Sequence, residues 1–254
     1  MTTLILLTKI NADSQLNQIS KTLDFSFKGL EVETKILGVV AHGWVQIALS
    51  GEDEGIATNY LIKEVGICPS NFVHVKKFST LKGYIKNIGK NGAALSVDVG
   101  VFQPKIGYAT IELRRLQAQL VDGKRIAIGK IAELFGLCEY LPVNVKVTGL
   151  NEEKSRIDAE LSSKQIRKYM VWRESLLDRL LVLGSSLHEV KATIEHAKVE
   201  RDVIDVEPLG LLEHVLTCKL GTDAAGLIPK IGRILRNAKF AVFNPKTLRD
   251  FLNT

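Results

Sequence analysis

The sequence predicts an α+β protein with a central five-stranded β-barrel between N- and C-terminal α/β units. Alternating apolar runs and turn residues fill residues 79–162, and segments with helical spacing lie on both sides of them. Of the 254 residues, 46% are hydrophobic, which is enough for a sizeable core in each of two or three domains. We therefore expect units at residues 1–78, 79–162 and 163–254.

The first unit begins with an apolar run at residues 3–8, which predicts a β-strand. Asp13 or Ser14 can cap a following helix, in which apolar residues recur at helical spacing as far as Leu23. The apolar run is too short for a signal peptide, and no stretch approaches the roughly 20 residues of a membrane span. The three cysteines are isolated, which is typical of a reducing cytoplasm.

The central unit contains two alternating runs, 81–88 and 93–100, around a Gly/Asn turn that predicts a hairpin. A short third strand follows at 107–110, and a last hairpin is predicted from 143–150 and 156–162. Two helical runs, 111–120 and 128–137, separate the third strand from the last hairpin. This is the position of the single helix in an oligonucleotide-binding (OB) barrel.

The order of these segments resembles the S-one domain, an OB-fold RNA-binding repeat. Its features here are Gly83 in the opening strand, the Val97–Gly100 strand, and the closing hairpin with Arg156 and Leu161-Ser162. The resemblance covers about a third of the chain and implies an RNA-binding barrel. The sequence departs from the family by its second helix and by lacking a Phe at 91–94, where the second strand usually carries base-stacking aromatics.

The whole chain also resembles an uncharacterised archaeal family described as carrying an S-one-like domain. This resemblance rests on the run at 113–123 and on Glu133–Cys138. It implies an archaeal, cytoplasmic protein and implies no particular activity.

The third unit is predicted to begin with a helical hairpin, formed by a helix from Ser163 to Leu183 and a second from about Ser186 to Arg201. A short final helix is capped by Asn244-Pro245. The segment 209–220 resembles 37–49, because each has a Leu-Gly run, a histidine (His42 or His214) and an alternating strand. Both segments also share the plan of the central barrel. The three are either related barrel-like repeats or hairpins that look alike by chance. We assign both histidines to turns.

Positive charge increases along the chain. The three units carry 7 basic and 8 acidic, 12 and 9, and 15 and 11 side chains, respectively. Residues 224–249 contain six Lys or Arg and no carboxylate, which is either a phosphate-binding surface or the solvated faces of two short helices. Tyr84, Phe102 and Tyr108 are the aromatics available for base stacking, unless they belong to the barrel core or rim. The residues predicted to bind nucleic acid are Tyr84, Lys86, Lys90, Tyr108, Lys164, Arg167, Lys168, Lys230, Arg233, Arg236 and Lys239.

No phosphate loop, metal-ligand spacing or nucleophile motif is present, so we expect neither an enzyme nor a cofactor. The first hypothesis is a non-catalytic RNA-binding protein of translation, ribosome function or RNA processing, with RNA or ribonucleoprotein as its partner. It requires Tyr84, Tyr108 and the basic residues to share one face. The second is an accessory protein of the ribosome, exosome or RNA polymerase that docks a protein partner through the insert at 111–137. It requires an exposed apolar patch there.

Overall fold

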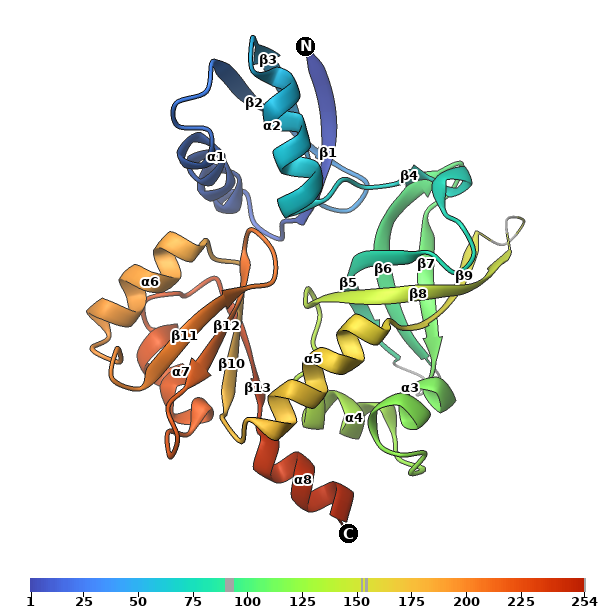
Figure 1. The fold of residues 1–254 in the computed structure, drawn as a ribbon, viewed down its shortest axis with the longest axis vertical. Helices are drawn as coiled ribbons and strands as arrows, with labels where there is room; N and C mark the ends of the chain where they lie inside the picture. The colour runs from blue at the N-terminus through green and yellow to red at the C-terminus, as the bar shows by residue number, and fades with distance from the viewer. Residues whose placement is uncertain (90–93, 152, 154, 254) are drawn as a thin grey trace.

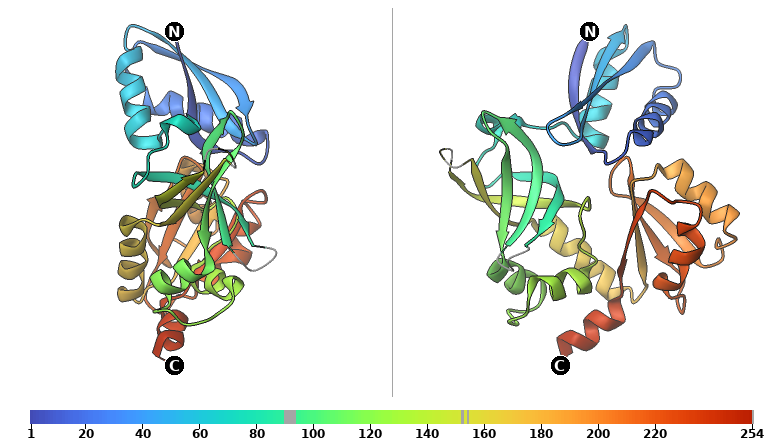
Figure 2. Two further views of the ribbon diagram at one scale, coloured as in Figure 1. Left: turned by 90° about the vertical axis from the view of Figure 1, so that its right-hand side faces the viewer. Right: turned by 180° about the vertical axis from the view of Figure 1, so that it is seen from behind.

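The computed structural model describes residues 1–89, 94–151, 153 and 155–253, and it contains three units (Figure 1). The N-terminal unit lies at the top of this view, the barrel at the right and the C-terminal unit at the left. A rotation of the view by 90° or 180° shows the same three units, with the N-terminal unit above the other two (Figure 2). The predicted α+β class with a central barrel is confirmed.

The barrel is closed by five strands, because antiparallel pairs join β6, β5, β8 and β9, and β7 pairs with both β9 and β6. The strands are β5 (Thr80–Ile88), β6 (Ala94–Gln103), β7 (Gly107–Glu112), β8 (Pro142–Asn151) and β9 (Arg156–Leu161). Helices α3 (Leu113–Leu120) and α4 (Ile128–Phe135) lie between the third and fourth strands, as in an OB fold. Gly83 is required where β5 meets β6, since a Cβ there would lie 2.5 Å from the Asp98 carbonyl oxygen.

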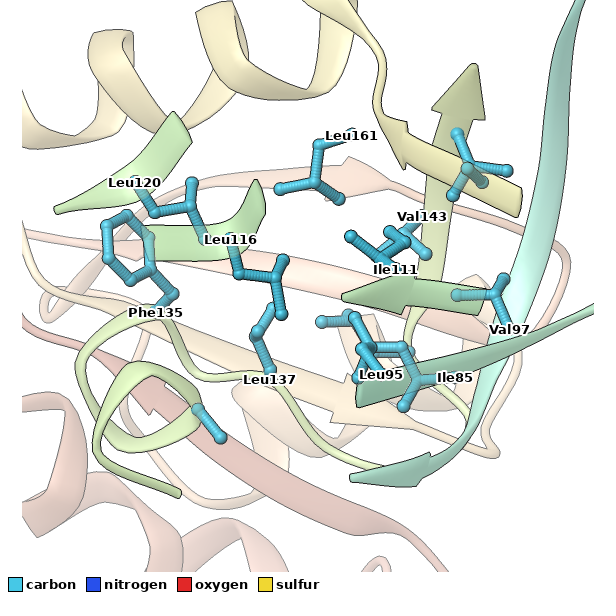
Figure 3. Packing of buried hydrophobic residues seen from close by; sticks show 14 of the residues in the cluster. Ile85, Leu95, Val97, Ile111, Leu116, Leu120, Phe135, Leu137, Val143 and Leu161 are labelled. Carbon is cyan, nitrogen blue, oxygen red and sulfur yellow. The ribbon is translucent and has the colours of Figure 1, made fainter. Parts of the chain in front are cut away.

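The barrel interior follows from the alternation of side chains along its strands. In β8, Val143, Val145 and Val147 are fully buried, whereas Asn144 and Lys146 between them face outward. Leucines of α3 and Phe135 of α4 cover one end of the barrel and continue its core (Figure 3). The insert at 111–137 therefore serves as core cover.

The N-terminal unit is an open antiparallel sheet with the strand order β1-β3-β2. Its elements are β1 (Thr2–Lys9), α1 (Ser14–Ser26), β2 (Val32–Val40), β3 (Trp44–Gly51) and α2 (Glu54–Tyr60), which continues as a wider turn at Leu61–Val65. Helices α1 and α2 pack on one face of the sheet. The chain then passes through β4 (Ser70–Asn71) and the single turn Phe72–His74 into the barrel.

The C-terminal unit has the order β11-β12-β10-β13, which with its two helices makes a βαββαβ, ferredoxin-like arrangement. Its elements are β10 (Arg179–Leu183), α6 (Leu187–His196), β11 (Val203–Pro208), β12 (Glu213–Cys218), α7 (Ala224–Gly232) and β13 (Lys239–Phe243), followed by α8 (Pro245–Asn253). Helices α6 and α7 cover one face of this sheet, and its other face continues the barrel core.

The first and third units share a βαββα plan, and the similar segments 37–49 and 209–220 include the β2–β3 and β11–β12 turns. Both units are open sheets, so the repeat does not extend to the barrel. His42 lies in a turn, as expected, but His214 lies inside β12.

The predicted helical hairpin is wrong in its first half. Helix α5 covers only Ser163–Glu174, and the chain turns at Leu176, which has φ +55°. Residues 179–183 form β10, a central strand in which all five residues are buried. A short apolar run buried on both faces has no period that distinguishes strand from helix. Helix α5, which we placed in the third unit, packs Tyr169 and Trp172 into the core of the barrel.

Candidate nucleic-acid interface

Tyr84 does not belong to an exposed face of the barrel, so its prediction as a base-stacking residue is wrong. Its side chain is 1% exposed and meets the Trp44 ring edge-on at 5.6 Å. Its hydroxyl lies 3.2 Å from both the Leu7 carbonyl oxygen and Glu213 Oε2. Tyr84 therefore joins the barrel to both other units. Phe102 is likewise packed against the same small cluster.

Lys86 and Tyr108 lie together on the outer surface of the barrel. The Lys86 ammonium is 4.1 Å from the centre of the Tyr108 ring and hydrogen bonds to the hydroxyl of Tyr108. The neighbouring surface carries both signs of charge, because Arg156 pairs with Glu112 and with Asp158. One cation on one aromatic ring is thus the part of the predicted barrel face that the structure brings together. Lys90 lies outside the described residues.

A cluster of lysines lies where helix α5 follows the barrel. Lys82 of β5 and Lys164 and Lys168 of α5 are close enough to influence one another electrostatically. Burial lowers the pKa of Lys82, against an opposing effect of Glu213, and the charges of Lys168 and Lys164 lower it further. We call these three residues the lysine cluster. Lys82 was missed because nothing in the sequence places a strand lysine beside a helix about 80 residues later.

One member of the lysine cluster is partly neutralised. Lys168 donates to Glu207 Oε1 of β11 at 2.8 Å and lies 5.1 Å from the centre of the Trp172 ring. Burial lowers the pKa of Lys168, and Glu207 opposes this effect. Lys164 and Arg167 are exposed on the same helix. The docked helix therefore adds positive charge beside the barrel.

The C-terminal basic run is divided between two places. Lys230 belongs to the last turn of α7 and Arg233 is its C-cap. Arg236 follows on the exposed segment after the helix, with its Nε donating to the Arg233 carbonyl oxygen at 3.5 Å. Lys239 instead pairs with Glu139 at 3.6 Å and lies over the Tyr140 ring. The predicted basic residues that the structure describes consequently lie at four places, which are the barrel (Lys86), helix α5, the end of α7 and Lys239 beside Glu139.

A buried polar junction fixes the three units to each other. Lys9 of β1 and Asp98 of β6 form an ion pair of 2.6 Å, and these side chains are 7% and 2% exposed. Glu213 is 2% exposed, and its carboxyl group lies against Gly210, where a Cβ would be 2.2 Å from Oε2. Burial raises the pKa of Glu213 to about 7, although Lys82 and the Tyr84 hydrogen bond act in the opposite direction.

His214, next to Glu213 in β12, points to the helix-covered face of the sheet. Its Nε2 hydrogen bonds to the Ser185 carbonyl oxygen at 3.0 Å, and burial lowers its pKa to about 4. The ring is therefore neutral at pH 7, and Nε2 is the nitrogen that carries the proton. This is a structural role, although it differs from the turn role that we expected.

A large groove lies between the N- and C-terminal units and was not anticipated from the sequence. It has a volume of about 1400 Å³ and is lined by α1, Tyr60, the Gly184–Glu189 segment, α6 and the Ile234–Asn237 segment. In Figure 1, α6 lies below α1. No local pattern could have indicated this groove, because its two walls are about 170 residues apart in the chain.

The insert at 111–137 was the expected docking surface, but its large hydrophobic side chains pack inside the protein. All of these residues are described by the structure, and none of their large hydrophobic side chains is exposed. Among the described residues, no group of three or more His, Cys, Asp or Glu is arranged to hold a metal ion. No helix in the described ranges has the length and apolar character needed to cross a membrane.

Together these features define a protein built of an OB barrel between a three-stranded α/β unit and a ferredoxin-like α/β unit. Three family models cover the same architecture. They are the DUF2110 N-terminal domain at residues 3–71, the DUF2110 central domain at 75–173 and the DUF2110 C-terminal domain at 177–243. The chain belongs to the DUF2110 family. The central-domain model includes α5, in agreement with the packing of that helix on the barrel.

Solved structures with some similarity come from three organisms. An uncharacterized protein from Methanocaldococcus jannaschii has 13% identity and a TM-score of 0.25, over 35% of this chain and 95% of that one. The a/eIF2alpha–aDim2p–rRNA complex from Pyrococcus horikoshii has 13% identity and a TM-score of 0.27, over 49% and 64%. The intact alpha subunit of aIF2 from Pyrococcus abyssi has 11% identity and a TM-score of 0.27, over 66% and 96%. No curated protein sequence matches the chain.

Proposed function

We propose that this protein is a non-catalytic RNA-binding protein that acts in translation, ribosome function or RNA processing. The observation that carries the proposal is the lysine cluster, in which Lys82 of the barrel lies within electrostatic range of Lys164 and Lys168 of the docked helix α5. Like charges held together lower one another's pKa, at a cost that a bound polyanion would offset. Phosphate groups of RNA are such a polyanion, and their neutralisation releases counterions.

The barrel supports the same proposal through its architecture. OB barrels bind oligonucleotides across their strands, commonly with aromatic side chains under the bases. Of the predicted site residues that the structure describes, Tyr108 is the one aromatic on the outer surface of the barrel, and Lys86 contacts its ring. A base on Tyr108 together with phosphates near Lys164 would place a single strand along the barrel.

The test is binding of a short single-stranded RNA, compared with duplex DNA, over a salt series. Lys164→Glu and Arg167→Glu are suitable variants because both side chains are exposed. The matched control is Lys219→Glu, an exposed lysine that follows β12 and belongs neither to the lysine cluster nor to the acid-free segment 224–249. We expect each site variant to weaken binding and to reduce the salt slope by about 0.7 per lost phosphate contact, with no change for the control.

The absence of RNA binding at low salt would overturn the proposal. Binding that all three variants weaken equally would indicate only a general effect of net charge, and it would remove the lysine cluster as the site. Circular dichroism of each variant shows whether the fold is retained.

A further inference from the structure

The groove between α1 and α6 has a size and a lining that the packing of the N- and C-terminal units does not require. At about 1400 Å³ it is larger than the roughly 300–1,000 Å³ typical of small-molecule pockets. Its lining comes from residues 14–65 and 184–237, so the barrel contributes nothing to it. A segment of a polymer fits a groove of this size better than a small metabolite does.

The walls of the groove are held in place by direct contacts between the two units. Gln15 Nε2 donates to the Gly184 carbonyl oxygen at 3.0 Å, and the Ser186 amide donates to Gln18 Oε1 at 2.9 Å. Leu212, from the turn between β11 and β12, is fully buried in the core of the N-terminal unit. The groove is therefore a preformed feature, and binding there requires little reorganisation.

Two aromatic rings on one wall are open to solvent. Phe25 near the end of α1 is 80% exposed, and Tyr60 is 40% exposed. Tyr60 is held by an edge-on contact with Phe27 at 5.7 Å and by its hydroxyl, 3.5 Å from Ser26 Oγ. Exposed aromatic rings in a groove are surfaces on which unpaired bases stack.

Positive charge is distributed over three sides of the groove. Lys21 lies on α1, Lys191 on α6 and Arg236 on the segment after α7, and all three are exposed. Among the described residues, none of these three cations has a carboxylate within ion-pair distance. Two carboxylates, Glu64 and Glu189, also line the groove, so the cations exceed the acids by one.

The positive charge continues out of the groove along α7. Arg236 lies against the backbone of Arg233, and Lys230 is one turn before Arg233, so the three form a basic ridge that begins at the groove. These residues belong to the acid-free segment 224–249. A ridge of this kind suits a strand that extends beyond the groove, because each successive phosphate can meet a cation.

We propose that this groove binds single-stranded RNA, with bases stacked on Phe25 and Tyr60 and phosphates at Lys21, Lys191 and Arg236. The inference rests on the proposed function and adds to it a second site, formed jointly by the N- and C-terminal units. RNA is favoured over an acidic peptide because the exposed groups include flat aromatic rings as well as cations.

The experiment measures binding of a short oligouridine to the full chain carrying Phe25→Ala, Lys21→Glu or Arg236→Glu. The matched controls are Phe78→Ala, another exposed aromatic (65%) that lies at the barrel, and Lys219→Glu, an exposed lysine outside the groove and outside segment 224–249. We expect each groove variant to weaken RNA binding about tenfold or more and the controls to leave it unchanged. Because Phe25 is so exposed, its truncation leaves the thermal unfolding midpoint unchanged.

Binding of a polyglutamate peptide is measured in the same way, because an acidic peptide is the alternative occupant of the groove. If the wild-type protein binds the peptide as tightly as the RNA, and Phe25→Ala weakens the binding of both equally, the assignment to RNA is overturned. If RNA binding survives all groove variants but is lost in Lys164→Glu, the groove inference fails while the proposed function stands. If the wild-type protein binds no RNA, both fail.

Discussion

Replacement of Glu213 by glutamine tests the account of the buried junction. Tyr84 has one hydroxyl hydrogen and two acceptors at 3.2 Å, the Leu7 carbonyl oxygen and Glu213 Oε2. If that hydrogen goes to Leu7, a protonated Glu213 can donate to the Tyr84 oxygen, so the neutral carboxyl suits the site. Glutamine keeps the shape and a donor but cannot ionise.

The expected size follows from the pKa of Glu213, which rises from 4.5 to about 7 on folding. The folded state binds more protons than the unfolded state between these values, so wild-type stability falls as pH rises through this window. The loss is about 3 kcal/mol in the free energy of unfolding by pH 8. His214 acts in the opposite sense. Its pKa falls from 6.5 to about 4, so it contributes stability that increases as pH rises from 4 to 6.5.

Urea unfolding of the wild type and Glu213→Gln at several pH values between 4.5 and 8 provides the measurement. The difference in the free energy of unfolding between the two proteins cancels His214 and every other group whose pKa the substitution leaves unchanged. We expect this difference to shift by about 3 kcal/mol in favour of the variant from pH 4.5 to 8. A difference that is constant over this range would refute the assignment of a proton to Glu213.

Three further substitutions address how the units are joined and what the barrel face does. Asp98→Asn leaves Lys9 buried without its counter-charge, so we expect a loss of about 3–5 kcal/mol by urea unfolding, and a smaller loss when Lys9→Met is added. Leu212→Ala removes a fully buried contact between the C-terminal turn and the N-terminal core, and it should cost about 2–5 kcal/mol. If the units were independent, the calorimetric transition of the barrel would not move in this variant. Tyr108→Ala should weaken single-stranded RNA binding by about 1–3 kcal/mol without changing the salt slope, whereas a changed slope with equal affinity would contradict a stacking role.

The barrel could be predicted because its information is local. Each of its hairpins contains its own alternation and turn residues, and Gly83 occupies a position where β5 and β6 approach closely. The same kind of evidence failed for 179–183, because an apolar run that is buried on both faces has no alternation. Burial of that strand depends on the barrel on one side and on α6 and α7 on the other, which are distant in the chain.

The sequence by itself determined the α+β class, the closed barrel with its helical insert and the acid-free basic segment. Only the tertiary structure decided that Tyr84 is buried, that Lys82 lies within electrostatic range of Lys164, and that a groove lies between α1 and α6. The physical reason is that exposure, pKa and the shape of a site depend on which distant segments pack together, and hydrophobic packing is not directional.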